Sequence, residues 1–149
     1  MERTGGGHYP ADAGQPLIVV DASAVVELLA TTPVGREVGQ RIREERLLHA
    51  PHLLDLEVIN AMRRQTAIHS LGADRVDASL TEYRNLRILR HPHHPYVNRV
   101  WEYRHQFSAY DACYLALTEA FGATLLTCDG ALKRARLSRG RVELVAGAI

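Results

Sequence analysis

Short apolar runs alternate along the chain with stretches whose apolar residues recur at helical intervals. The clearest runs, 17–20 and 123–128, have the length and the β-branched content of fully buried strands. Shorter runs at 47–50, 88–89 and 142–145 predict three further strands. Strands that alternate with helices form parallel sheets with right-handed crossovers, so the pattern predicts an α/β fold.

Helical segments are predicted between these strands from the spacing of their apolar residues and from their terminal residues. In chain order they cover 24–30, 34–45, 51–62, 73–86, 96–107, 108–117 and 131–136. Pro51 is expected near the first turn of its helix, and the last helix is basic.

The remaining bulk features predict one intracellular domain. Residues 1–15 contain Gly5-Gly6-Gly7 and too little apolar content to pack, so we expect a mobile tail followed by a domain over 16–149. The sequence has no apolar span long enough for a membrane and no signal-peptide pattern, which predicts a soluble, cytoplasmic protein. Cys113 and Cys128 are too few and too widely spaced for a disulfide framework or a zinc site.

Arginine dominates the basic residues, because only Lys133 among the 18 is lysine. The planar guanidinium suits phosphate recognition, while a GC-rich codon bias explains the same skew equally well. The histidines of 91–95 suggest a metal site, but the two prolines among them favour a rigid exposed turn.

The segment 96–107 places Arg99 and Arg104 beside aromatic residues, a combination that can stack on single-stranded nucleic acid. The helix-stripe pattern favours the alternative, a half-buried helix whose inward residues are Val97, Val100 and Trp101. Both interpretations remain open at this point.

Four acidic residues occupy positions that an ordinary core does not require. Asp21 and Asp129 each end a buried strand, and ligands of open α/β sheets bind beyond the carboxyl ends of strands. Glu57 and Asp111 lie on or beside the apolar faces of their helices. One strand–helix topology can therefore bring all four into one crevice.

Each acid also has a structural explanation when it is taken singly. Asp21 can cap the following helix, Asp129 with Gly130 can form a turn, and Ser108 to Asp111 matches a capping box. Glu57 is hardest to explain in this way, because we see no basic residue on its helix face.

A cluster of these acids needs protons or cations. Two carboxylates about 4 Å apart repel by roughly 4 kcal/mol at an effective dielectric constant of 20. Mg²⁺ or Mn²⁺ would relieve this repulsion through hard oxygen ligands and leave coordination positions open for phosphate oxygens. Zinc is disfavoured because the four residues include neither histidine nor cysteine.

The segments around these acids resemble the PIN-domain nucleases, and most of all the VapC-type toxins of bacterial toxin–antitoxin pairs. The resemblance runs from Pro16 to the C-terminus, with the four acids in family order. The segments that carry it are Val20-Asp21-Ala22-Ser23-Ala24, Leu56-Glu57-Val58-Ile59-Asn60-Ala61, Tyr110-Asp111-Ala112-Cys113-Tyr114-Leu115-Ala116-Leu117 and Leu126-Thr127-Cys128-Asp129.

The resemblance implies a three-layer α/β/α fold, Mg²⁺- or Mn²⁺-dependent cleavage of RNA, a VapB-type antitoxin partner and a homodimer. Asp21 and Asp111 resemble the family's principal metal ligands. Glu57 and Asp129 complete the acidic site. The small polar residues that support this site correspond to Ser23, Asn60 and Thr127.

In the expected mechanism, the acidic site orients and acidifies a water for attack on an RNA phosphodiester. Arg99 and Arg104 are expected to neutralise the flanking phosphates of the substrate. One rival, a phosphoacceptor signalling module, requires a lysine after a late strand, whereas Lys133 falls within a predicted helix. A second rival is a catalytically silent PIN scaffold that binds RNA or protein.

Overall fold

A five-stranded, all-parallel sheet forms the centre of the protein in a computed structural model that describes residues 15–67 and 72–146. Its strand order is β3-β2-β1-β4-β5. The strands are β1 (Ile18–Val20), β2 (Leu48–Pro51), β3 (Ile88–His91), β4 (Thr124–Thr127) and β5 (Arg141–Leu144). All five predicted strands are confirmed, while the predicted mobile tail lies, except for Gln15, outside the described residues.

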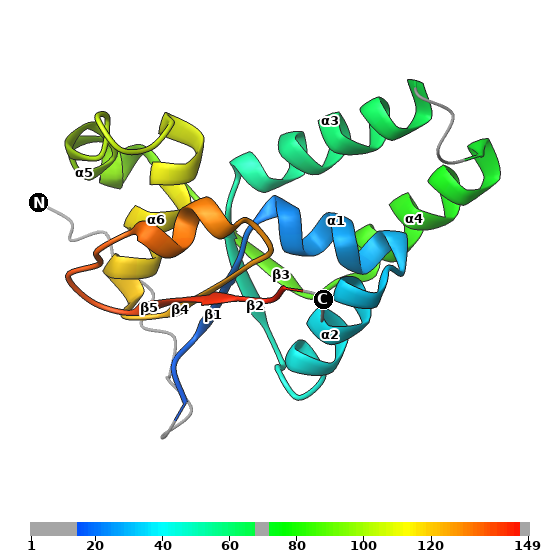
Figure 1. Ribbon diagram of the computed structural model, residues 1–149, viewed down its shortest axis with the longest axis horizontal. Helices are drawn as coiled ribbons and strands as arrows, with labels where there is room; N and C mark the ends of the chain where they lie inside the picture. The colour runs from blue at the N-terminus through cyan, green and yellow to red at the C-terminus, as the bar shows by residue number, and fades with distance from the viewer. Residues whose placement is uncertain (1–14, 68–71, 147–149) are drawn as a thin grey trace, which may run out of the picture.

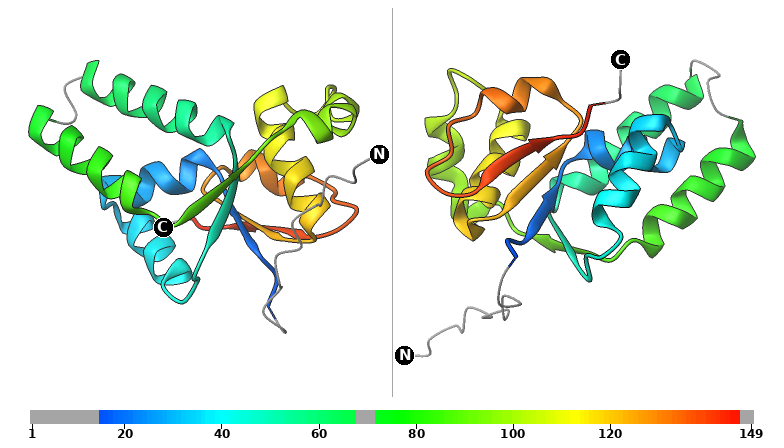
Figure 2. Two further views of the ribbon diagram at one scale, coloured as in Figure 1. Left: turned by 180° about the vertical axis from the view of Figure 1, so that it is seen from behind. Right: turned by 60° about the horizontal axis from the view of Figure 1, so that its bottom comes forward.

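Helices cover both faces of this sheet, as Figures 1 and 2 show. α5 and α6 lie on one side, and α1 to α4 lie on the other, with α3 and α4 extending together away from the sheet. The helices are α1 (Ala22–Ala30), α2 (Pro33–Ile42), α3 (Leu53–Ala67), α4 (Ala73–Asn85), α5 (Val97–Glu102) and α6 (Ala109–Phe121), with short 3-10 helices η1 (His94–Tyr96) and η2 (Gly130–Arg134). The three-layer α/β/α fold is therefore confirmed.

The two central strands are buried on both faces, which explains their unbroken apolar runs. β1 pairs with β4 so that Ile18 lies opposite Thr124 and Val20 opposite Leu126, and none of the four is more than 1% exposed. Full burial of each aliphatic side chain contributes about 2 kcal/mol. This register brings the carboxyl ends of the two strands side by side, so the residues that follow them lie at the same end of the sheet.

The predicted helix over 96–107 is wrong in its length and, except for Val100, in its inward face. α5 ends at Glu102, and Val97 and Trp101 are 50% and 67% exposed. Tyr103 takes the inward place instead, because its hydroxyl donates a hydrogen bond of 2.5 Å to the buried Glu119 Oε1. A buried acid outside the segment thus decides which aromatic residue turns inward.

Other boundaries also differ from the prediction, and the predicted basic helix over 131–136 is the short 3-10 helix η2. Pro51 ends β2, and α3 begins only at Leu53. His91 ends β3 and is half-buried, so the predicted exposed turn begins after it. The His91 ring stacks on that of His49 at a centroid distance of 5.2 Å, and the two rings are hydrogen-bonded at 2.9 Å.

Candidate active site

Asp21 follows β1 directly and caps α1, and its side chain is 6% exposed. Oδ1 accepts hydrogen bonds from Ser23 Oγ at 2.7 Å and from the Ala24 amide at 3.1 Å. Oδ2 accepts a hydrogen bond from Thr127 Oγ1 at 2.7 Å. Burial nevertheless raises the Asp21 pKa to about 6, because the hydrogen bonds only partly offset the loss of water, and the charge of Asp129 raises it further.

Ser23 and Thr127 join the ends of β1 and β4. Their hydroxyl oxygens lie 3.2 Å apart, and Ser23 Oγ accepts a hydrogen bond from the Cys128 amide at 2.9 Å. Thr127 Oγ1 accepts from the Asp129 amide, also at 2.9 Å, which fixes the start of the Asp129 turn beside Asp21. The two small polar residues named in the sequence analysis therefore hold the two strand-end acids in place.

Asp111 on α6 and Glu57 on α3 are the other two acids, and Asp111 interacts electrostatically with both Asp129 and Glu57. The Asp111 amide donates to Ser108 Oγ at 3.1 Å, which confirms that Ser108 caps α6. The pKa of Asp111 is raised first by burial and then by the charge of Asp129. The pKa of Glu57 is raised by burial and then by the charge of Asp111. Electrostatic coupling thus links all four acids.

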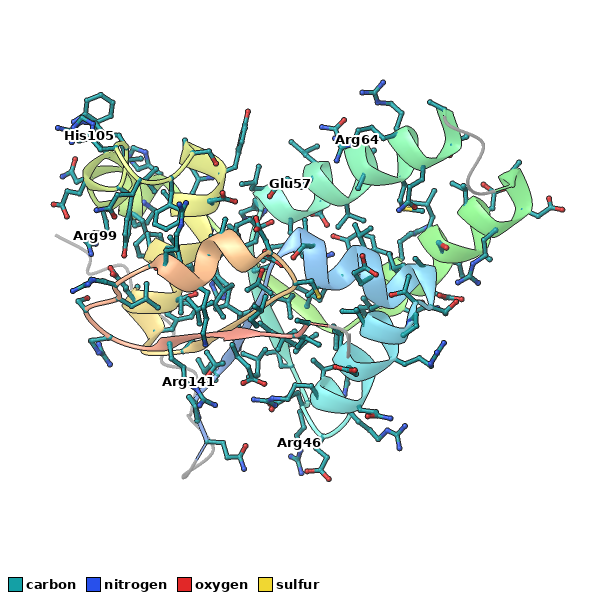
Figure 3. The ribbon with its side chains drawn as sticks, viewed as in Figure 1. Arg46, Glu57, Arg64, Arg99, His105 and Arg141 are labelled. Carbon is teal, nitrogen blue, oxygen red and sulfur yellow. The ribbon has the colours of Figure 1, made fainter. Side chains whose placement is uncertain are left out.

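Glu57 has an unusual environment. Its Oε1 and the Tyr114 hydroxyl are both buried without a hydrogen-bond partner in the described part of the chain. Tyr114 is 2% exposed and close enough to Glu57 to lower the pKa of that carboxyl, although no bond of normal geometry joins them. Arg64, two turns further along α3, also lowers this pKa, which corrects our expectation that no basic residue shares that face (Figure 3).

The chemistry of this crevice fits a hard divalent cation. Among residues 15–67 and 72–146, no three His, Cys, Asp or Glu side chains are arranged as a ready ligand cage. Mg²⁺ does not require one, since it commonly binds one or two carboxylates and completes its shell with water. Burial is the main cause that raises the pKa of Asp21, Glu57 and Asp111, and a nearby cation would favour their ionised forms. Burial raises the thiol pKa of Cys113 and of Cys128 to about 11, which disfavours thiolate ligation.

Comparison with known proteins identifies the family. A model of the PIN domain matches residues 18–137. The chain belongs to the PIN-domain family. Ribonuclease VapC12 of Mycobacterium tuberculosis is 39% identical over 131 residues, which cover 87% of this chain and 100% of the relative. Ribonuclease VapC9 of the same organism is 41% identical over 113 residues, 76% of this chain and 86% of the relative. Within the PIN family, the chain therefore belongs with the VapC ribonucleases.

Solved structures show the same PIN fold. PAE2754 from Pyrobaculum aerophilum has a TM-score of 0.59 and 24% identity, and the match covers 85% of this chain and 89% of that one. The Mycobacterium tuberculosis VapC20 toxin, described as cleaving the sarcin–ricin loop, has a TM-score of 0.60 and 16% identity, with 83% and 98% covered. No helix in the described part of the PIN domain is long and apolar enough to cross a membrane.

The other three predicted site residues of this PIN domain form no hydrogen bond or ion pair with the four acids. Asn60 is exposed and forms no hydrogen bond with a described residue, so its supporting role stays a prediction. The Arg99 guanidinium donates to Glu119 at 2.7 and 2.8 Å and to Glu102 at 2.6 Å, contacts that favour a structural role. Arg104 is exposed and stacks on Trp101, with its Cζ 4.7 Å from the ring centroid.

Tyr114 is the residue of this PIN domain that the sequence analysis missed. It lies one helical turn after Asp111, so its position on α6 was a signal that it faces the same crevice. An aromatic residue in an apolar helix is usually core, and the hydroxyl's proximity to Glu57 became visible only in three dimensions.

Proposed function

We propose that the protein is a Mg²⁺-dependent endoribonuclease and the toxin of a type II toxin–antitoxin pair. The observation that carries the proposal is a buried carboxylate, Asp21, at the end of β1, which Thr127 links to Asp129 at the end of β4, with two further acids on α3 and α6. The names of the VapC relatives support RNA as the substrate. The acids are Asp21, Glu57, Asp111 and Asp129.

In this proposal Asp21 and Asp111 would hold the metal ion, and Glu57 and Asp129 would hold a water or a second ion. The bound ion, Mg²⁺ or Mn²⁺, supplies charge that acidifies the attacking water and stabilises the leaving oxygen. Thr127, with Ser23, keeps the Asp21 carboxylate oriented toward the crevice.

The proposal is tested by incubating purified protein with a mixture of structured RNAs and Mg²⁺ or Mn²⁺. Asp21→Asn removes one carboxylate from the site, and EDTA removes the metal. Asp77→Asn is the matched control, because Asp77 is exposed on α4 and far along the chain from the four acids. Binding of Mn²⁺, followed by calorimetry, provides a readout that does not depend on cleavage.

We expect metal-dependent cleavage that is lost in Asp21→Asn and in EDTA but kept in Asp77→Asn. Binding of RNA without cleavage, in every RNA offered, would favour the silent PIN scaffold instead. Cleavage that survives both EDTA and Asp21→Asn would show that the acidic crevice is not the active site.

We also propose a VapB-type antitoxin partner and a homodimer. A largely apolar groove of about 220 Å³ lies between α3, α5 and α6, and the large exposed apolar side chains of Val97 and Tyr110 line it. Apolar surface of this kind commonly marks a protein interface. The groove is lined by Leu53, His93, Val97, Val100, Ala109, Tyr110 and Cys113. Sedimentation of the protein alone tests the dimer, and a monomer at micromolar concentration contradicts it.

A further inference from the structure

A second cavity, of about 350 Å³, lies between the segment 105–107 and two arginines in and just after η2. One wall comes from 105–107, the segment just before the Ser108 cap of α6, and Figure 3 shows His105 on this segment. The other wall comes from Arg134 and Arg136, in and just after η2, the helix that begins next to Asp129. Both walls are thus continuous in sequence with acids of the proposed active site.

The lining of this cavity is basic, amide and aromatic, and none of its described lining residues is acidic. Arg136 is exposed and forms no hydrogen bond or ion pair with a described residue. The Arg134 guanidinium lies over the Phe107 ring at 5.8 Å, and only its Nε is engaged, in a bond to the Ala131 carbonyl. The terminal nitrogens of two arginines therefore remain available to a ligand.

Other arginines of the chain contrast with this pair. Arg41 is bound to Glu143, Arg90 to Asp55 and Arg99 to Glu119. An unpaired guanidinium that follows Asp129 closely in the chain suits a polyanion that must approach carboxylates, since the phosphates on either side of the reacting one need positive partners.

We propose that this cavity is a subsite for one unpaired nucleotide of a single-stranded RNA segment next to the scissile phosphate; the proposal rests on the proposed function. Arg136 binds the phosphate of that nucleotide. Its base stacks on the plane of the Arg134 guanidinium, which the Phe107 ring supports from below. The volume lies at the lower end of the range for small-ligand pockets, which suits one nucleotide and not a duplex.

The test compares Arg134→Gln and Arg136→Gln with Arg46→Gln. Arg46 is a matched control because it is exposed and forms no hydrogen bond or ion pair with a described residue. It precedes the amino end of β2, whereas Asp21 and Asp129 follow the carboxyl ends of their strands (Figure 3). Cleavage kinetics use a single-stranded RNA oligonucleotide with Mg²⁺. Fluorescence anisotropy of the same RNA is measured in an Asp21→Asn background, so that binding is read without cleavage.

Each cavity variant is expected to raise KM and Kd roughly tenfold and to leave kcat unchanged. Arg136→Gln should also reduce the slope of log Kd against log salt by about 1. Arg46→Gln should match the wild type. Equal melting temperatures of the three variants would show that the surface substitutions leave the fold intact.

The subsite is overturned if both cavity variants bind RNA as Arg46→Gln does, or if duplex RNA loses as much affinity as single-stranded RNA. It is also overturned if RNA binding is unchanged and only binding of an acidic antitoxin segment weakens. Failure of the proposed function would give a different result. The wild type would then cleave no RNA, while the cavity variants would still bind RNA more weakly by fluorescence anisotropy. Cleavage by all variants with unchanged KM would refute the subsite alone.

Discussion

Replacing Asp21 by asparagine should stabilise the metal-free protein at neutral pH while it abolishes cleavage. The side chain is 6% exposed, and burial raises its pKa from 3.8 to about 6. A folded-state pKa above the unfolded value means that the native state binds the extra proton, so stability falls as pH rises from 3.8 through about 6. At about 1.4 kcal/mol per pKa unit, the ionised carboxylate costs about 3 kcal/mol at pH 7.5.

Asparagine carries no charge and keeps an oxygen for the Ser23 and Ala24 donors. Its amide nitrogen must face the Thr127 hydroxyl in place of a carboxylate oxygen, a change that costs about 1 kcal/mol. We therefore expect the variant to be about 2 kcal/mol more stable than the wild type at pH 7.5, in EDTA. With a typical urea dependence, this corresponds to a midpoint higher by about 1 M.

The assay is urea unfolding of both proteins at pH 4 and pH 7.5, without metal and then with Mn²⁺. The difference in unfolding free energy between Asp21→Asn and the wild type should be largest at pH 7.5 and should shrink or reverse at pH 4. It should also narrow in Mn²⁺, because the ion stabilises only the wild type. A variant that is less stable than the wild type at pH 7.5 in EDTA would refute the reasoning. In that case the hydrogen bonds of Asp21 would outweigh its burial.

Three more outcomes follow from contacts in the structure. Arg99→Gln should lower the free energy of unfolding by about 2 to 3 kcal/mol, because the buried Glu119 loses its cationic partner and keeps only neutral donors such as the Tyr103 hydroxyl. The KM for RNA should stay unchanged, and a raised KM at unchanged melting temperature would show that Arg99 binds the substrate. Burial and the charge of the neighbouring His91 lower the His49 pKa from 6.5 to about 4, so the unfolded chain binds the proton more tightly than the folded protein. His49 therefore contributes stability that is present above pH 6.5 and is lost as the pH falls toward 4. This loss amounts to at most about 3 kcal/mol of unfolding free energy. In an Asp21→Asn background, His49→Gln should reduce the loss in urea titrations, and an unchanged dependence of stability on pH would contradict the prediction. Tyr114→Phe, compared by calorimetry, should weaken Mn²⁺ binding several-fold if its hydroxyl positions Glu57, and equal affinity would leave Tyr114 a core residue.

The sheet and the location of the acidic crevice could be predicted from sequence because each depends on local patterns. A continuous β-branched run such as 17–20 identifies a strand buried on both faces, and parallel topology then places the strand ends together. Asp21 and Asp129 were therefore predictable as neighbours, and the charge of Asp129 does raise the Asp21 pKa. Their roles as metal ligands remain a proposal.

Features that depend on contacts between distant segments could not be predicted. Helical periodicity alone did not decide whether Trp101 or Tyr103 turns inward, because Glu119, a buried acid on another helix, attracts Tyr103. The same acid binds Arg99, so proximity of an arginine to aromatic residues in sequence did not indicate an available guanidinium. The arginines of the second cavity follow Asp129 in the chain, but 105–107 approaches them only through the fold.

The structural and catalytic explanations of Asp21 are compatible, because they use different lone pairs of one carboxylate. An ionised carboxylate has about four acceptor sites. Ser23 and Ala24 occupy Oδ1, and Thr127 occupies one site on Oδ2, which leaves about one site on Oδ2 for a cation. The cap therefore orients the carboxylate and restricts it to monodentate binding. It follows that Asp21→Ala, which loses cap and charge together, should be less stable than Asp21→Asn although both lose the metal ligand.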